Sequence, residues 1–290
     1  MIIFIAATCI GLTVVAGSAY LSWRLEWKSL VIFVALIVLS VISSGNPEGI
    51  PMMSIPFVLG GIGGMAFKKG KSTEFYLVTT TAVLSVLITG FFYYYLLIEK
   101  VNFFEMQRVL ISKSFEAGQV PPDLRAQWLE VFDASKYVVP FGIVINALVL
   151  SSISYIFIKN ILVRFFGARL AAGIEYFRVN DYFIFALLSG LALYLLIDTD
   201  EYALVHFAGL NILLIATLFY LVQGLAVVRF LLIKRGIPSY IVVLTFAGLL
   251  FLGITGLWAV LFLSVLLAGF GALDLWADFR KLSKHDGIKS

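Results

Sequence analysis

The sequence predicts an all-α fold, a polytopic transmembrane helical bundle of about nine spans that forms a single integral membrane domain over residues 1–290. Hydrophobic residues make up 61% of the chain and charged residues 13%, whereas soluble domains average about 45–50% and about 25%. The charges also fall into gaps between long apolar runs, and about 20 mostly apolar residues are enough for a helix to cross a bilayer. We therefore expect a multi-pass protein of the cell inner (plasma) membrane.

Nine apolar runs follow one another along the chain, and each is expected to form one membrane helix. They cover residues 2–22, 28–44, 51–67, 75–98, 137–163, 182–197, 203–228, 238–253 and 256–273. Most are long enough to cross the hydrocarbon core. The runs 182–197 and 238–253 are short and need their flanking residues to complete a crossing.

The first run could be a signal peptide, because the small residues from Ala16 to Ala19 resemble a cleavage site. A signal peptide has a cationic segment before a shorter apolar core. Here no cation precedes the run and the run is longer, so we expect a retained membrane helix. Cys9 is the only cysteine of the sequence, which excludes an intramolecular disulfide.

The positive charges occupy every second gap, which predicts the orientation of the protein. Alternate gaps, with the C-terminal tail, hold sixteen of the Lys and Arg residues, and the other side holds five, all within residues 99–136. Cytoplasmic loops accumulate Lys and Arg. The N-terminus is therefore expected outside and the C-terminus inside.

The same rule divides the last apolar block, residues 238–273, into two helices. A single helix would place the basic tail outside, against the pattern of the other loops. Gly253 and Gly256 provide residues for a turn between the two, because glycine accepts backbone angles that other residues avoid.

Residues 99–136 are expected to form an amphipathic helical segment on the extracytoplasmic side. Apolar residues recur at helical spacing before and after Pro121 and Pro122, and Asp123 is a candidate N-cap of the second helix. One interpretation is a lid or partner surface over an outward-facing cavity. The favoured one is a pair of interfacial helices that lie in the headgroup region and connect two spans.

Polar side chains inside the spans are the candidate ligand-binding residues, because such groups are costly in lipid. They are Asn146, His206, Asn211 and Gln223. Asn146 and Asn211 lie about 12–14 Å from the outer surface at about 1.5 Å rise per residue, and both could face one cavity for a small polar ligand. The alternative, which is favoured, is hydrogen bonding that holds helices together. His206 lies nearer the outer surface, and Gln223 nearer the cytoplasmic end.

Small residues four positions apart predict close helix packing. The pairs are Gly60 with Gly64, Ala7 with Gly11, and Ala186 with Gly190.

Motifs of catalysis and nucleotide binding are missing from the sequence. It has no Walker A loop, no HExxH, no GxSxG and no Cys/His cluster with metal-ligand spacing. We expect no catalytic residue, no metal site, no cofactor and no nucleic acid, and an enzyme that acts on lipid headgroups is the weakest alternative. Asp274 and Asp278 lie beside Arg280 and Lys281, and we interpret them as solvated charge pairs at the cytoplasmic edge.

Three segments of the second half carry a family resemblance: Phe177 to Tyr182, Leu221 to Ala226, and Asp274 to Arg280. With them the chain resembles the YybS-like family of uncharacterised bacterial multi-pass membrane proteins. That family is distantly similar to the substrate-binding membrane subunits of energy-coupling-factor transporters. The resemblance implies an outward-facing pocket for a small molecule and dependence on a separate ATPase, which is an argument from fold-level analogy.

Two functions are therefore expected. The first is a small-solute binding or transport subunit that lacks its own ATPase, with its pocket near Asn146 and Asn211. The second is a structural or scaffold membrane protein of a cell-envelope complex. The expected partners are the lipid bilayer and other membrane subunits.

Overall fold

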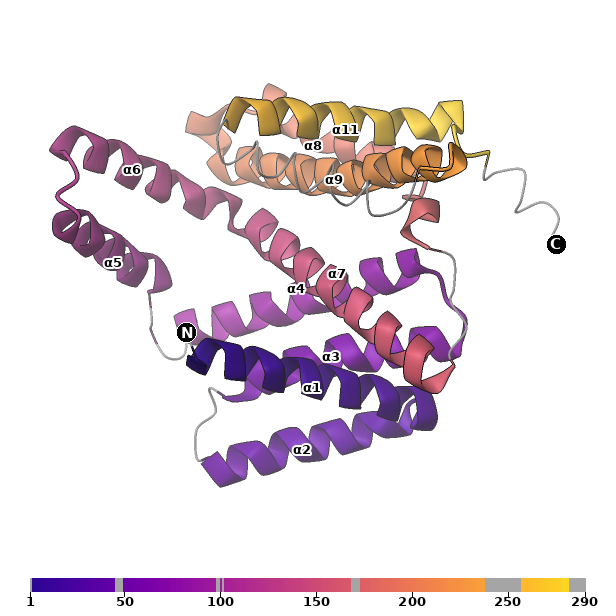
Figure 1. The fold of residues 1–290 in the computed structure, drawn as a ribbon. Coiled ribbons are helices and arrows are strands. Elements are labelled where there is room, and N and C mark those ends of the chain that lie inside the picture. Colours follow the sequence, from indigo (N-terminus) through magenta and orange to yellow (C-terminus); the bar gives the residue numbers. More distant parts are fainter. Residues whose placement is uncertain are drawn as a thin grey trace. The chain divides into compact units, whose positions relative to one another are not determined.

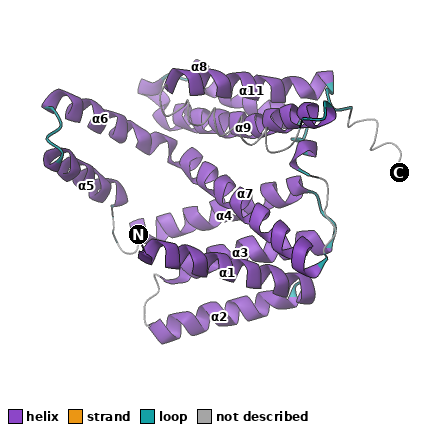
Figure 2. Ribbon diagram, in the orientation of Figure 1, coloured by secondary structure: helices purple, strands orange, loops and turns teal. Residues whose placement is uncertain are grey.

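The computed structural model describes residues 2–44, 49–97, 100, 102–167, 173–237 and 257–281. Every regular element in these ranges is helical, as Figure 2 shows. The all-α, membrane-type fold that the sequence predicts is confirmed. The apolar run 238–253 lies outside the described residues.

The helices follow the predicted apolar runs closely. Their order is α1 Ile2–Leu25, α2 Lys28–Ser44, α3 Gly49–Lys68, α4 Thr73–Leu97, α5 Phe103–Ala117, α6 Pro122–Ser135, α7 Val139–Phe166, α8 Phe183–Leu196, α9 Thr199–Lys234 and α11 Leu257–Ala277, with short 3₁₀ turns η1 Lys136–Val138 and η2 Ile174–Tyr176. Among the described residues, three helical stretches are long and apolar enough to cross a membrane: Thr73–Leu97, Pro122–Phe166 and Glu201–Lys234. Shorter apolar helices accompany them.

The chain divides into two compact units. Unit 1 contains Met1–Lys68 and Leu77–Gly167, and unit 2 contains Lys69–Tyr76 and Ala168–Ser290. The sequence predicts one integral membrane domain, and that prediction stays open.

In unit 1, α1 and α3 run parallel and in close contact (Figure 1). A Cβ atom at Gly60 would overlap Val15 O, and one at Gly64 would overlap Ala19 O. The backbones can approach because these positions carry no side chain, so the predicted packing role of this pair is confirmed. Gly11 differs, because a Cβ atom there would meet no described atom within 4 Å.

In unit 2, α9 packs against both α8 and α11 (Figure 1). Gly190 of α8 lies against the backbone of Leu213, which confirms the packing role of that glycine. Gly224 of α9 and Gly271 of α11 form a second close contact, at which a Cβ atom would overlap the facing backbone. Helix α8 runs antiparallel to α9, whereas α11 runs parallel to α9.

Residues 99–136 contain two helices separated at Pro121, as predicted. The N-cap prediction is wrong: Pro121 is the N-cap of α6, and Asp123 lies in the first turn without capping it. The reason is Pro122, because proline fits the first helical position and starts the helix there. In α5, Asn102 is the N-cap, and its side-chain oxygen accepts a hydrogen bond from Glu105 N at 3.2 Å.

Candidate functional site

Unit 1 contains a cavity of about 350 Å³ between α1, α2, α3 and α4. Its walls are mostly apolar, and the rings of Phe33 and Phe57 stack there with 4.9 Å between their centroids. Phe33 on α2 and Phe57 on α3 lie on the helix faces that line the cavity. A hollow lined in this way can hold a small apolar body.

Polar groups close one end of this cavity, at the turn between α1 and α2. The hydroxyls of Ser22 and Ser29 are 2.9 Å apart, and Ser29 donates a second hydrogen bond to Glu26 O at 2.6 Å. The Glu26 carboxylate pairs with Lys68 Nζ at 2.9 Å. The backbone of Glu26 has a φ of +53°, so the tight reversal of the chain after α1 holds these groups together.

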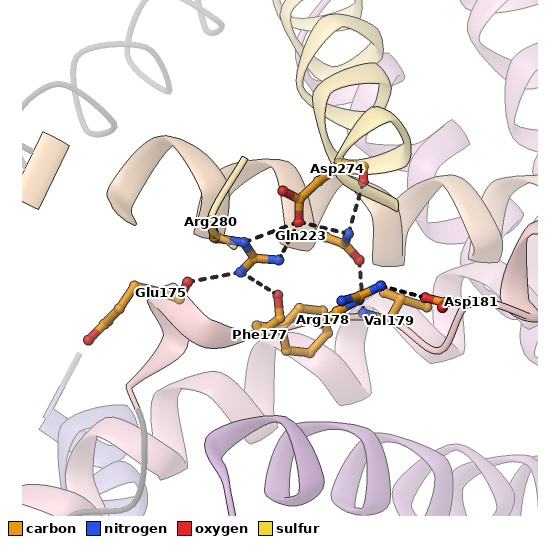
Figure 3. A network of polar contacts seen from close by, with 9 residues as sticks. Glu175, Phe177, Arg178, Val179, Asp181, Gln223, Asp274 and Arg280 are labelled. Carbon is orange, nitrogen blue, oxygen red and sulfur yellow. Dashed lines mark hydrogen bonds and ion pairs between the residues drawn. The ribbon is translucent and has the colours of Figure 1, made fainter. Parts of the chain in front are cut away.

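Unit 2 contains a buried polar network, which Figure 3 shows from close by. The Arg280 guanidinium donates to Asp274 Oδ2 from Nη2 at 2.6 Å and from Nε at 3.1 Å. Its Nη1 donates to the carbonyl oxygens of Glu175 and Phe177 at 2.9 and 2.8 Å. The side chains of Arg280 and Asp274 are 0% and 2% exposed. This ion pair is therefore shielded from solvent.

Gln223 extends the network from α9. Its Oε1 accepts a hydrogen bond from Val179 N at 2.8 Å, and its Nε2 donates to Gly271 O at 2.9 Å and to Asp274 Oδ2 at 3.4 Å. The side chain reaches Gly271 because the glycine contact brings the backbones of α9 and α11 together. One amide thus connects two helices and the segment before α8.

The chain reverses after α11 so that Arg280 can return to Asp274 only six residues earlier. Asp278 and Lys281 have φ of +41° and +54°, and Lys281 N donates to Asp278 O at 2.8 Å. At the same place, the guanidinium donates to Glu175 O of the 3₁₀ turn η2 and to Phe177 O just after it.

The interpretation of Asp274 as a solvated charge is therefore wrong. Spacing along the sequence places it at the end of an apolar run, where water is close. The turn after α11 covers it with Arg280 instead, and residue 274 is 2% exposed. A second ion pair lies at η2, where Arg229 Nε is 3.3 Å from Glu175 Oε2.

The predicted ligand-binding residues lie in different surroundings. Asn146 Nδ2 donates to Gly142 O at 2.8 Å on its own helix, α7, in unit 1. Asn211 Nδ2 donates to Phe207 O at 2.8 Å on α9. His206 Nδ1 is 3.0 Å from Ile197 O and its ring lies against Tyr194. Of the four, Gln223 joins the buried network, and a ligand role for all four stays a prediction.

The network combines the three segments that carry the family resemblance: Phe177 to Tyr182, Leu221 to Ala226 and Asp274 to Arg280. Sequence reasoning expected charge pairs at this edge but missed the burial of Asp274 and Arg280. The available signal was their place in one of those segments.

A comparison with protein families finds one family that matches almost the whole chain. Residues 2–274 match the family described as "Predicted membrane protein (DUF2232)". The chain belongs to the DUF2232 family. No curated protein and no solved structure matches it. The DUF2232 match includes the residues of the unit 1 cavity, and of the unit 2 network it includes Gln223 and Asp274 but ends before Arg280.

Proposed function

We propose that this DUF2232 protein binds a small solute within the membrane, as a binding or transport subunit that lacks its own ATPase. The observation that supports this proposal most directly is the cavity of about 350 Å³ in unit 1. Ligand cavities of proteins usually measure about 300–1,000 Å³ and are mostly apolar with a few polar groups. The cavity of unit 1, with its stacked aromatic rings and its serine end, has this character.

The YybS-like resemblance supports the same proposal. It extends to the substrate-binding subunits of energy-coupling-factor transporters, which bind a small molecule and rely on a separate ATPase. We further propose an inner membrane location, with the N-terminus outside and about nine spans, because the alternating basic gaps favour that orientation.

The test is thermal unfolding of the purified protein in lipid nanodiscs against a panel of small solutes. We expect at least one solute to raise the Tm, and Val58→Phe to abolish that rise because Val58 lines the cavity. Val86→Phe is the matched control, since Val86 is 75% exposed on α4. A rise that survives Val58→Phe would exclude this cavity as the site.

The earlier candidate residues are tested in the same assay. If Asn146, His206, Asn211 and Gln223 form the site, Asn146→Leu combined with Asn211→Leu abolishes the rise in Tm while Val58→Phe leaves it. The two sets of variants therefore discriminate between a polar site near these amides and the apolar cavity.

A structural or scaffold role in a cell-envelope complex is the second candidate, and the α5–α6 hairpin favours it. A groove of about 420 Å³ lies between these helices, and Trp128 and Val131 are 58% and 62% exposed beside it. A photo-crosslinking amino acid at position 128 should then capture one partner protein in cells. Recovery of the uncrosslinked monomer alone would argue against this role.

A further inference from the structure

Three residues that line the unit 1 cavity, on α2 and just before it, are also exposed on the surface of unit 1. Trp27, Leu30 and Val34 line the cavity, yet they are 67%, 58% and 51% exposed on the surface of unit 1. Helix α2 is formed by an apolar run that we assign to a membrane span. If α2 crosses the bilayer as the sequence predicts, its exposed Leu30 and Val34 meet hydrocarbon, and the cavity would open sideways into the bilayer.

The polar side chains of the wall already have partners within the protein. Ser22 and Ser29 share a hydrogen bond, Ser29 also donates to Glu26 O, and the Glu26 carboxylate pairs with Lys68. Ser54 also has a partner. A solute with polar groups along its body would lose its hydrogen bonds to water without replacing them here, and that loss opposes binding.

An apolar chain meets the opposite situation. Phe33, Phe57, Val58 and Ile62 offer it an aromatic and aliphatic wall, and transfer from lipid into this wall removes no hydrogen bond. The volume of about 350 Å³ lies near the lower end for ligand cavities, so it accommodates one chain or one chain end rather than a whole two-chain lipid.

We infer that the solute is an uncharged molecule with an acyl or isoprenoid chain, dissolved in the bilayer, which enters the cavity laterally past α2. This inference rests on the proposed binding function and specifies its substrate class. The hydroxyl protons of Ser22 and Ser29 are already used, but a hydroxyl oxygen has two acceptor lone pairs, so this end can still accept one hydrogen bond from a polar group at the end of such a chain.

The test uses the full chain in liposomes with an uncharged long-chain alcohol that carries a diazirine at its chain end. After irradiation, mass spectrometry of the peptides locates the label. We expect saturable labelling of the α2 and α3 residues that line the cavity, suppressed by excess unlabelled alcohol. Labelling of lipid-facing residues such as Val86 should not saturate, because they only meet bulk lipid.

Two variants sharpen the result. Val58→Phe should remove the saturable labelling, and Val86→Phe should keep it. Competition by the unlabelled alcohol needs no variant, so the test holds even if Val58→Phe fails to fold.

The outcomes separate this inference from the proposed function. If the alcohol labels lipid-facing residues alone, while a water-soluble solute raises the Tm in a way that depends on Val58, the cavity binds a solute but the lateral, apolar route is wrong. If neither probe gives a signal that depends on Val58, the binding function and the inference both fail.

Discussion

Arg280 joins the C-terminal tail to α11 and to η2 through one guanidinium group. Its four hydrogen bonds end on Asp274, Glu175 and Phe177 at 2.6–3.1 Å. Burial of such a pair is costly, and the pair is stable only while both partners and the surrounding hydrogen bonds are present. Together with Gln223, the residue therefore holds the segment before α8 against α11.

The first prediction concerns this ion pair. Arg280→Met should lower the free energy of unfolding by about 3–5 kcal/mol, because it leaves the Asp274 carboxylate buried without its cation. The double variant with Asp274→Leu should be less destabilised, because neither charge is then left alone. Chemical denaturation in detergent measures both values. Equal destabilisation of the single and double variants would show that the pair itself is not coupled.

The second prediction concerns Gln223. Gln223→Leu keeps the approximate volume but removes the acceptor of Val179 N and the donor to Gly271 O. We expect a loss of about 1–3 kcal/mol in the free energy of unfolding, because a buried amide hydrogen loses its partner. Asn146→Leu is the control, since Asn146 is exposed and donates its hydrogen bond to Gly142 O of its own helix. Similar effects of the two substitutions would contradict the role of Gln223 as a connector.

At the scale of elements, glycine contacts decide which helices pair. Gly60 and Gly64 permit the α1–α3 contact, and Gly224 and Gly271 permit the α9–α11 contact. In lipid, helices associate through close van der Waals packing rather than through the hydrophobic effect. The contacts at these glycines consequently carry much of the cohesion of each unit.

The third prediction follows from that packing. Gly64→Ala should destabilise unit 1 by about 1–3 kcal/mol, because the added methyl group overlaps the α1 backbone and overpacks the contact. Gly11→Ala should cost nothing or stabilise, since the position is open and alanine is the better helix former. Thermal unfolding of the two variants in the same detergent compares them, and equal Tm values would argue against a tight α1–α3 contact.

At the scale of the whole molecule, the directions of the helices bear on the topology. Gln223 meets Gly271 and Asp274, and Arg229 and Arg280 both meet Glu175. The C-terminal ends of α9 and α11 therefore lie together. Two spans in the block 238–273 stay a prediction of the sequence, since residues 238–256 lie outside the described part of the chain.

The fourth prediction is the orientation itself. In a Cys9→Ser background, a cysteine at Gln119 should react with a membrane-impermeant maleimide on intact cells. Cysteines at Lys69 and Lys281 should react only after the membrane is opened, because the basic gaps are expected inside. Reaction of position 281 on intact cells would reverse the predicted position of the C-terminus.

The sequence by itself determined the helical class, the approximate positions of the described helices and the membrane as surroundings. The physical reason is that the length of an apolar run and the charges beside it act locally along the chain, whatever other helices pack against it. The break at Pro121 was likewise readable, because proline acts on its own backbone. The contact of Gly64 with α1 could be predicted as a packing site, although not its partner.

Only the tertiary structure decided the environment of each polar residue. Asp274 looked solvated along the sequence and is buried, because a turn of positive-φ residues returns Arg280 to it. The cavity of unit 1 was also beyond sequence reasoning, since its wall combines residues from four helices whose mutual packing no local pattern specifies. Whether a polar side chain is buried, and which groups it bonds, depends on segments that are far apart in the chain and meet only in the folded structure.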